Sequence, residues 1–222
     1  MLIELDFPAV LAEWPQLAKG VAWTLGLTAV STVIGVAIGV LCAWSRTSGP
    51  RWLQWLVGIY VELIRNTPFI VQMFFLFFGL PSIGFRLSAL QAAALAMTIN
   101  LAAYAIEILR AGLEAVPPGQ REAGRSMGLG PLLIFGFIVL PQALANVYPA
   151  LVGQITITML ESAVVSQIAV VDLTHVADYI QSRNFRSFET YLVITLIYLV
   201  LAVLMRRMLA LAGRQLFAGR VR

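Results

Sequence analysis

The stretch from Val21 to Trp44, VAWTLGLTAVSTVIGVAIGVLCAW, contains no charged residue over 24 positions. As an α-helix it would extend for roughly 36 Å, which exceeds the ~30 Å hydrocarbon core of a bilayer. The chain of 222 residues shares this character, because 60% of it is hydrophobic and 12% is charged, against ~25% charged in an ordinary soluble domain. The composition predicts a polytopic membrane protein and excludes collagen, disordered chains, disulfide scaffolds and nucleic-acid binders.

Further charge-poor runs predict an all-α membrane protein with a single transmembrane domain over residues 1–222. We expect five transmembrane helices, at about Gly20–Trp44, Leu53–Leu80, Ser88–Leu109, within Ala143–Val171, and at Tyr191–Met205.

The segment 110–131, between the third and fourth spans, is too polar to lie in lipid. It contains five charges, five Gly and three Pro. The apolar stretch 132–140 that follows is too short to span a bilayer and ends before Pro141. We expect this stretch to form a short helix at the membrane surface.

The basic residues predict the orientation of the chain. With five spans, ten arginines fall on one side of the membrane, and four basic residues fall on the other. Because cytoplasmic loops are enriched in Lys and Arg, we expect the N-terminus outside and the C-terminus in the cytoplasm. The ten are Arg46, Arg51, Arg110, Arg121, Arg125, Arg206, Arg207, Arg214, Arg220 and Arg222, and the four are Lys19, Arg86, Arg183 and Arg186.

Ionisable residues inside spans are candidates for function, because charges are costly in lipid. Glu62 and Arg65 share a helix face and can neutralise each other. Glu107 lies one turn from Arg110, at the end of its span. Glu161 has no nearby cation in sequence, and we expect it to line a water-accessible pathway or to bind another helix or subunit.

Two polar stripes accompany these carboxylates. Asn100 lies on one face of the third span with Glu107, and Gln154 and Thr158 share a face with Glu161 in the fourth. For the stripe of the third span, hydrogen bonding between helices and the lining of a pathway both remain open.

Motifs of soluble enzymes are missing from the sequence. His175 has no second His or Cys to form a metal site, and Lys19, the only lysine, is in no Walker-type loop. We therefore expect a non-catalytic chain without metal or cofactor, and any ATP would be hydrolysed by another chain.

One cytoplasmic motif resembles the signature loop of ABC importer permeases. The pattern Glu-Ala-Ala-x3-Gly-x9-Ile-x-Leu-Pro matches residues 122–141, with Gly124 in place of the second Ala. The resemblance implies a coupling helix within about 117–141 that docks on an ATPase subunit. The expected coupling residues are Gln120, Arg121, Glu122, Ala123, Gly124, Gly128, Leu140 and Pro141.

Other stretches are similar to the polar amino-acid branch of this family, the histidine/glutamine/arginine-type permeases. They include ELIRNTP at 62–68, EILRAG at 107–112 and VPPGQ at 116–120. The resemblance implies a permease that imports polar amino acids through the inner membrane of a bacterium. Its partners would be an ATP-binding subunit dimer that holds ATP and Mg²⁺, a second permease subunit, identical or homologous, and an external solute-binding protein.

One departure from the family concerns substrate selectivity. Many relatives have Leu-Lys-Asp in the fourth span where this chain has Leu160-Glu161-Ser162. A carboxylate there would suit a cationic group, which favours basic amino acids. The expected pathway residues are Arg65, Asn66, Thr67, Gln72, Asn100, Gln154, Thr158 and Glu161.

Two other functions compete with this interpretation. An ATP-independent secondary transporter or channel would leave the docking motif unexplained, and five spans do not divide into inverted repeats. An intramembrane enzyme would need a catalytic constellation, but the Glu residues lack a nearby His, Cys or second carboxylate in sequence.

Overall fold

A computed structural model describes residues 5–218, and all regular secondary structure in this range is helical. The chain divides into two compact units. Unit 1 comprises Met1–Thr32, Pro68–Thr98 and Thr156–Met205, and unit 2 comprises Val33–Thr67, Ile99–Ile155 and Arg206–Arg222. The four longest helices each contribute residues to both units.

These four helices account for the membrane-spanning character of the chain. They are α2 (Trp14–Ser48), α5 (Ala89–Glu114), α8 (Leu140–Glu161) and α10 (Ser187–Leu216). In the described range four helical segments are long and apolar enough to cross a membrane, and a fifth span results if α3 and α4 are joined. The prediction of an all-α protein with several spans is confirmed, and the orientation of the spans stays a prediction.

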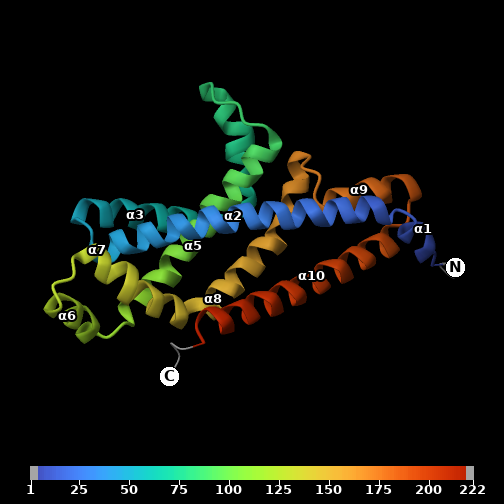
Figure 1. Cartoon of the computed structure of the whole chain (residues 1–222). Coiled ribbons are helices and arrows are strands. Elements are labelled where there is room, and N and C mark those ends of the chain that lie inside the picture. The colour runs from blue at the N-terminus through green and yellow to red at the C-terminus, as the bar shows by residue number, and fades with distance from the viewer. Residues whose placement is uncertain (1–4, 219–222) are drawn as a thin grey trace. The chain divides into compact units, whose positions relative to one another are not determined.

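Unit 1 has two apolar clusters. In one, Met73 of α4 packs with Met97 of α5 and Val165 of η4. In the other, Leu17 of α2 packs with Val176 of α9 and Ile194 of α10, so that three helices lie together (Figure 1). The shorter elements of this unit are α1 (Phe7–Leu11), α4 (Phe69–Phe74), η1 (Phe75–Gly79), η2 (Leu80–Ile83), η4 (Ser162–Ile168) and α9 (Leu173–Asn184).

Unit 2 is built around the second half of α5. Leu109 of α5 packs with Ala43 of α2, Ile134 of η3 and Leu151 of α8. Ile106 on the same helix contacts a smaller cluster that includes Val61 of α3. The shorter elements here are α3 (Arg51–Arg65), α6 (Pro118–Ser126), α7 (Pro131–Leu133) and η3 (Ile134–Val139).

The prediction of one continuous helix over Leu53–Leu80 is wrong, because α3 ends at Arg65 and α4 begins at Phe69. Asn66 Nδ2 donates to the Glu62 carbonyl oxygen at 2.8 Å, and Thr67 Oγ1 donates to the Leu63 carbonyl oxygen at 2.8 Å. These side chains satisfy the last carbonyls of α3, and Pro68 has no N–H with which to continue the helix.

The prediction of a separate short helix that ends at Pro141 is also wrong. The helical segment runs from Pro131 to Ile168, and Pro141 lies inside it. The turns that precede Pro141 form the π-helix η3, in which carbonyl groups bond to amides five residues ahead. We attribute the continuity to this wider turn, which relieves the clash that a proline ring makes with an α-helical carbonyl.

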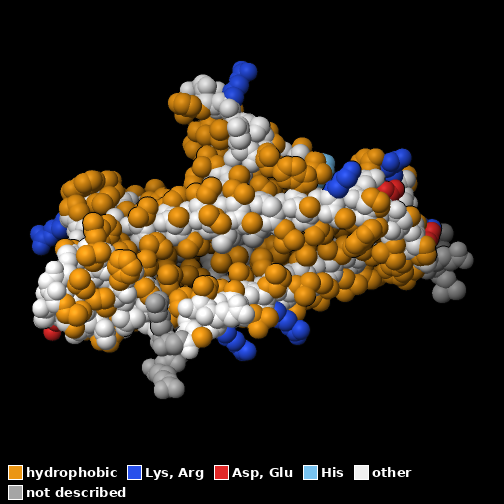
Figure 2. Space-filling view, viewed as in Figure 1, with side chains coloured by type: hydrophobic (Ala, Val, Ile, Leu, Met, Phe, Trp, Pro, Cys, Tyr) orange, Lys and Arg blue, Asp and Glu red, His pale blue; other side chains and the backbone are white. Residues whose placement is uncertain are grey.

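The surface of the chain suits a lipid environment. Figure 2 shows hydrophobic side chains over much of the visible face, with charged side chains confined to a few places. Exposed apolar residues occur along every long helix, among them Trp23 and Val33 of α2, Leu160 of α8 and Leu199 of α10. A soluble monomer does not normally expose apolar patches of this extent.

Candidate functional site

The signature motif begins with the short helix α6. Pro117 precedes it in an extended conformation, and Pro118 occupies the first helical position. Proline suits this position, because its fixed φ is helical and its missing N–H would have had no partner in the helix. Pro118 therefore favours the start of α6 at this residue.

The end of α6 is fixed by a tight turn. Gly128 has a φ of +72° and donates its N–H to the Arg125 carbonyl oxygen at 2.9 Å. Leu129 donates to the Gly124 carbonyl oxygen at 3.1 Å. These two bonds form a Schellman motif, which requires a left-handed residue at the position of Gly128. The glycine of the signature therefore terminates the helix.

Gly124 lies at the contact between α6 and the following helix. A Cβ atom here would lie 2.9 Å from Ile134 Cγ1 and 3.0 Å from Ile138 Cδ1, so the two helices approach too closely for a side chain. Gly124 is buried against the chain itself, and glycine permits this packing. Its role in coupling stays a prediction.

Some of the remaining side chains of the motif contact the rest of the chain, and others are exposed to solvent. Arg121 Nη2 donates to the Leu113 carbonyl oxygen at 3.0 Å and so satisfies an acceptor in the last turn of α5. This contact lies within the chain, and the coupling role of Arg121 stays a prediction. Most of the other positions of α6 are exposed, among them Gln120, Glu122, Ala123 and Arg125.

The start of α8 completes the base of α6. Leu140 and Pro141 are half-buried. Gln142 Nε2 donates to the Ile138 carbonyl oxygen at 2.8 Å and lies 3.5 Å from Gln120 Oε1. Gln142 thus connects the start of α8 to α6, so Gln120 and Pro141 lie in the same region of unit 2.

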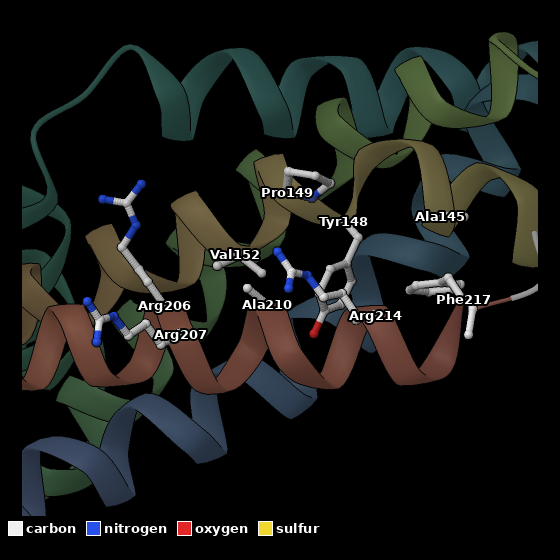
Figure 3. A pocket seen from close by; sticks show the side chains of 11 residues that line it. Ala145, Tyr148, Pro149, Val152, Arg206, Arg207, Ala210, Arg214 and Phe217 are labelled. Carbon is white, nitrogen blue, oxygen red and sulfur yellow. The ribbon is translucent and has the colours of Figure 1, made fainter. Parts of the chain in front are cut away.

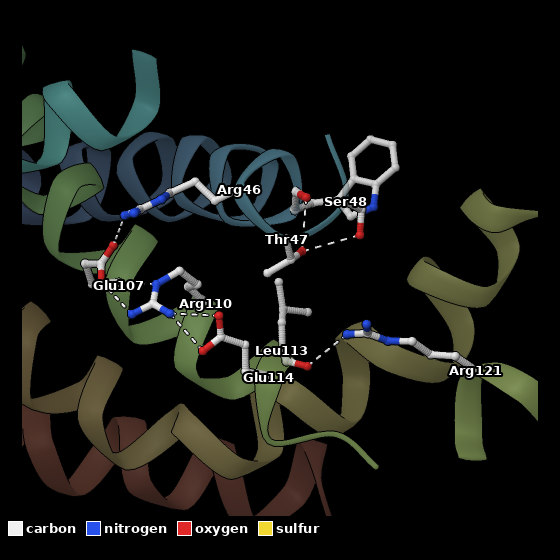
Figure 4. Close-up of polar contacts among 9 residues, drawn as sticks. Arg46, Thr47, Ser48, Glu107, Arg110, Leu113, Glu114 and Arg121 are labelled. Carbon is white, nitrogen blue, oxygen red and sulfur yellow. Dashed lines mark hydrogen bonds and ion pairs between the residues drawn. The ribbon is translucent and has the colours of Figure 1, made fainter. Parts of the chain in front are cut away.

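An ion-pair network links α2 and α5 near α6 (Figure 4). Glu107 binds Arg46 through one carboxylate oxygen and Arg110 through the other, the latter at 2.9 Å. Arg110 also reaches Glu114 at 2.8 Å. The pairing of Glu107 with Arg110 is confirmed. Its pairing with Arg46 could not be inferred from spacing, because 61 residues separate the two.

Arg65 contacts an aromatic ring rather than a carboxylate. Its guanidinium carbon lies 5.2 Å from the centre of the Tyr104 ring, a cation–π geometry. Glu62 instead accepts from Asn66 Nδ2 at 2.8 Å. Within residues 5–218 no ion pair joins Glu62 to Arg65, so the predicted neutralising pair is wrong. Tyr104 follows Asn100 by one turn of α5, which places Arg65 near this polar stripe.

The pathway candidates divide between the two units. Arg65, Asn66, Thr67, Asn100 and Gln154 belong to unit 2, and the other three belong to unit 1. Asn66 and Thr67 bond to the end of α3, and Asn100 and Gln154 are buried.

In unit 1, Thr158 and Glu161 occupy the last turn of α8. Thr158 is 1% exposed, and its Oγ1 has no hydrogen-bond partner among the described residues. Glu161 is half-buried and, within the same part of the chain, has no ion-pair partner. Gln72 lies on α4. This helix packs on η4, the segment that follows Glu161 in sequence, through Met73 and Val165. Thr158 and Glu161, two polar residues without a hydrogen-bond or ion-pair partner for these groups in the described residues, thus lie one turn apart at the end of α8.

Asp172 is a buried carboxylate that the sequence interpretation did not single out. It caps α9, accepts from the His175 amide at 2.8 Å and accepts from the Tyr198 hydroxyl at 3.1 Å. Burial raises the pKa of this carboxyl above its usual range, although these hydrogen bonds oppose the shift. Asp directly before an apolar-periodic segment was the available sequence signal.

Comparison with known proteins gives consistent matches. The family described as "Binding-protein-dependent transport system inner membrane component" matches residues 35–217. The arginine transport system permease protein ArtQ of Bacillus subtilis (strain 168) is 33% identical over 91% of this chain and 93% of its own length. The probable glutamine ABC transporter permease protein GlnM of the same organism is 39% identical over 78% of each chain.

A solved structure agrees with these relatives. The chain is similar, with a TM-score of 0.86 and 37% identity, to a chain described as "Crystal structure of an amino acid ABC transporter with histidines". The match covers 96% of this chain and all of the other.

Proposed function

Because the chain belongs to the family of binding-protein-dependent transport system inner membrane components, we propose that it is the permease subunit of an ATP-driven amino-acid importer. It provides the membrane pathway, and a separate ATP-binding subunit dimer binds ATP and Mg²⁺. A second permease subunit and an external solute-binding protein complete the complex, in the inner membrane of a bacterium. The match of nearly the whole chain to permeases of ABC systems favours this function over an ATP-independent transporter.

The division of charge between the units supports the proposed orientation. Among residues 5–218, the eight arginines expected on the cytoplasmic side belong to unit 2, and the four basic residues expected outside belong to unit 1. The N-terminus lies outside, the C-terminus lies in the cytoplasm, and α6 faces the cytoplasm.

The packing of α6 against its flanking helices is the observation that supports the coupling role. Gly124 packs on Ile134 and Ile138, and Arg121 binds the last turn of α5, so α6 is fixed to the two helices that flank it. A displacement of α6 is therefore passed to α5 and α8. Closure of the ATP-binding subunits would bias the pathway between two arrangements through this contact, which is coupling between separate sites.

The exposed face of α6 supplies the docking charges. Glu122 and Arg125 are exposed, and neither side chain has an ion-pair partner among residues 5–218. We expect Glu122→Arg to abolish uptake of the amino acid while ATP hydrolysis falls or becomes independent of the binding protein. Arg86→Glu, an exposed charge reversal in unit 1, should leave the ratio of uptake to hydrolysis unchanged. Normal coupled uptake by Glu122→Arg in reconstituted vesicles would contradict the docking role.

The substrate class follows from Glu161. Glu161 follows Thr158 by one turn at the end of α8 in unit 1, and no cation pairs with it within the described residues. A cationic side chain or α-ammonium of a substrate would neutralise it, so the transporter favours basic amino acids. Arg65, Asn66, Thr67, Gln72, Asn100 and Gln154 are the further pathway residues.

Uptake by the complete complex tests this preference. Glu161→Gln should lower transport of arginine and lysine more than tenfold and leave transport of glutamine within about twofold, since one charge-assisted hydrogen bond is worth ~1.5–3 kcal/mol. Glu114→Gln, an exposed carboxylate of α5, is the matched control. Unchanged uptake and selectivity in Glu161→Gln would exclude the proposed role.

A further inference from the structure

A cleft between α8 and α10 in unit 2 has no part in the coupling or pathway sites. Its volume is about 680 Å³, within the ~300–1,000 Å³ typical of small-molecule sites. Tyr148, Pro149 and Val152 form the wall on α8, and residues from the last three turns of α10 form the other (Figure 3).

The wall of the cleft is held in a defined shape. Tyr148 donates its hydroxyl to the Leu209 carbonyl oxygen at 2.8 Å, and its ring meets the Phe217 ring edge-on with centroids 5.4 Å apart. A Cβ at Gly213 would lie 2.2 Å from the Tyr148 ring, so this contact depends on a glycine in α10. The aromatic pair thus gives the cleft a rigid apolar side.

Three guanidinium groups project from α10 beside this apolar wall (Figure 3). They belong to Arg206, Arg207 and Arg214, and no acidic residue lines the cleft. None of the three has a hydrogen-bond or ion-pair partner in the described part of the chain. After Glu189 the sequence contains no Asp or Glu, so the charge of this region is entirely positive.

The cleft lies where a membrane helix leaves the apolar run of its span. The charge-free run of α10 ends at Met205, directly before Arg206. Met208 and Leu211 on the same helix are exposed, at 68% and 57%, so apolar surface continues past the first arginines. A ligand here meets an apolar wall and cationic groups together, which a water-soluble anion does not require.

We propose that this cleft binds an anionic phospholipid of the cytoplasmic leaflet. The phosphate lies among Arg206, Arg207 and Arg214, and an acyl chain lies along Tyr148 and Val152. Basic pockets between membrane helices on the cytoplasmic side are known to hold anionic headgroups, and each Lys or Arg near such a surface contributes ~1 kcal/mol. The site is separate from substrate and ATPase, so its occupancy does not depend on Glu161 or α6.

Lipid retention measures this occupancy directly. The complete complex is placed in nanodiscs of equimolar phosphatidylglycerol and phosphatidylcholine, released into detergent and examined by native mass spectrometry. We expect one phosphatidylglycerol retained per permease subunit in preference to phosphatidylcholine. Arg214→Gln should reduce this preference about fivefold, and the triple replacement of Arg206, Arg207 and Arg214 by Gln should abolish it.

Two further variants separate a site from diffuse charge attraction. Arg51→Gln removes an exposed arginine of unit 2 outside the cleft and should leave the preference unchanged. Ala210→Trp fills the cleft without a change of charge and should displace the lipid.

Three results would overturn the proposal. They are an unchanged preference in the triple variant, an unchanged preference in Ala210→Trp, and retention of lipid only by permease stripped of its ATP-binding subunits. The last would mean that a protein partner covers the cleft in the complex. Uptake is not the readout, so failure here is distinguishable from failure of the proposed transport function.

Discussion

The two units of the chain differ in the number of charged residues and in how their carboxylates are paired. Among residues 5–218, unit 2 has nine basic and four acidic residues, and unit 1 has four basic and six acidic residues. In unit 2 the carboxylate Glu107 is enclosed by Arg46 and Arg110, and α6 presents both signs of charge. In unit 1 Glu161 has no cation among the described residues, and Asp172 is held by hydrogen bonds.

This difference separates a structural use of charge from a functional one. A carboxylate bound between two arginines contributes to the joining of helices and has little capacity left for a substrate. A carboxylate without a cation in a largely apolar setting is costly and is retained where a ligand or partner can neutralise it. Unit 2 therefore fits the role of the coupling half, and unit 1 contains the carboxylate that fits a cationic substrate.

The largest difference in stability is expected when a Glu is replaced by Gln in each unit. Glu107→Gln leaves Arg46 without its partner and should lower the free energy of unfolding by about 2–3 kcal/mol, less than for a fully buried pair because both side chains are partly exposed. Glu161→Gln removes an unpaired charge and should leave stability unchanged or raise it. Thermal unfolding of the purified complex measures both. Equal destabilisation by the two substitutions would remove the distinction between the units.

A smaller effect is expected where α6 meets its base. Gly124→Leu introduces a side chain against Ile134 and Ile138 and should destabilise the region by about 1–3 kcal/mol. Ala123→Leu, on the exposed side of the same helix, should change stability by less than about 0.5 kcal/mol. Hydrogen exchange of residues 118–140 distinguishes them. Similar protection in both variants would show that α6 is not fixed by this packing.

The turn after α6 tests the effect of backbone conformation alone, because Gly128 has a positive φ. Gly128→Ala places a Cβ at a φ of +72° with no atom within 4 Å, so only conformational strain of about 1 kcal/mol opposes it. Gly130→Ala, at a φ of −71°, should have no comparable effect. The difference between their melting temperatures is the measurement. The Schellman assignment fails if the two variants unfold together.

The smallest effect concerns the pH response of unit 1. The pKa of Asp172 is raised on folding, so the folded chain binds more protons than the unfolded chain between the ordinary pKa of ~3.9 and the raised value. The contribution of Asp172 to stability is thus greatest below the ordinary pKa and falls as pH rises through the raised one. Asp172→Asn keeps the α9 cap and should flatten this response in hydrogen exchange of α9. A pH profile identical to that of the unmodified chain would contradict the assignment.

The fold was predictable where a signal is local in sequence. Charge-free length predicted the long apolar helices, and the motif over 122–141 predicted a short helix between the third and fourth spans. The end of α3 at Arg65 was not predicted, because the sequence on both sides of the break is largely apolar. The helix ends there through hydrogen bonds from the Asn66 and Thr67 side chains to the carbonyl oxygens of Glu62 and Leu63. The continuity through Pro141 was missed because a π-helical turn is not encoded by a simple period.

The candidate site was predictable as a motif and not as a set of contacts. The signature over 122–141 identified the family, and the comparisons confirm the resemblance to amino-acid ABC permeases. The contacts of Arg121 and Gly124 within the chain could not be predicted, because their partners, Leu113 and Ile134, come from flanking helices that only the fold brings close. The contact of Arg65 with Tyr104 required the same knowledge.

We expect unit 2 to face the ATP-binding subunits through α6, and we expect unit 1 not to contact them. A photo-crosslinking residue placed at exposed Ala123 of α6, or at exposed Ser82 of η2 in unit 1, tests this in the assembled complex. We predict a crosslink to the ATP-binding subunit from position 123 and none from position 82. A crosslink from position 82, or none from position 123, would contradict the account.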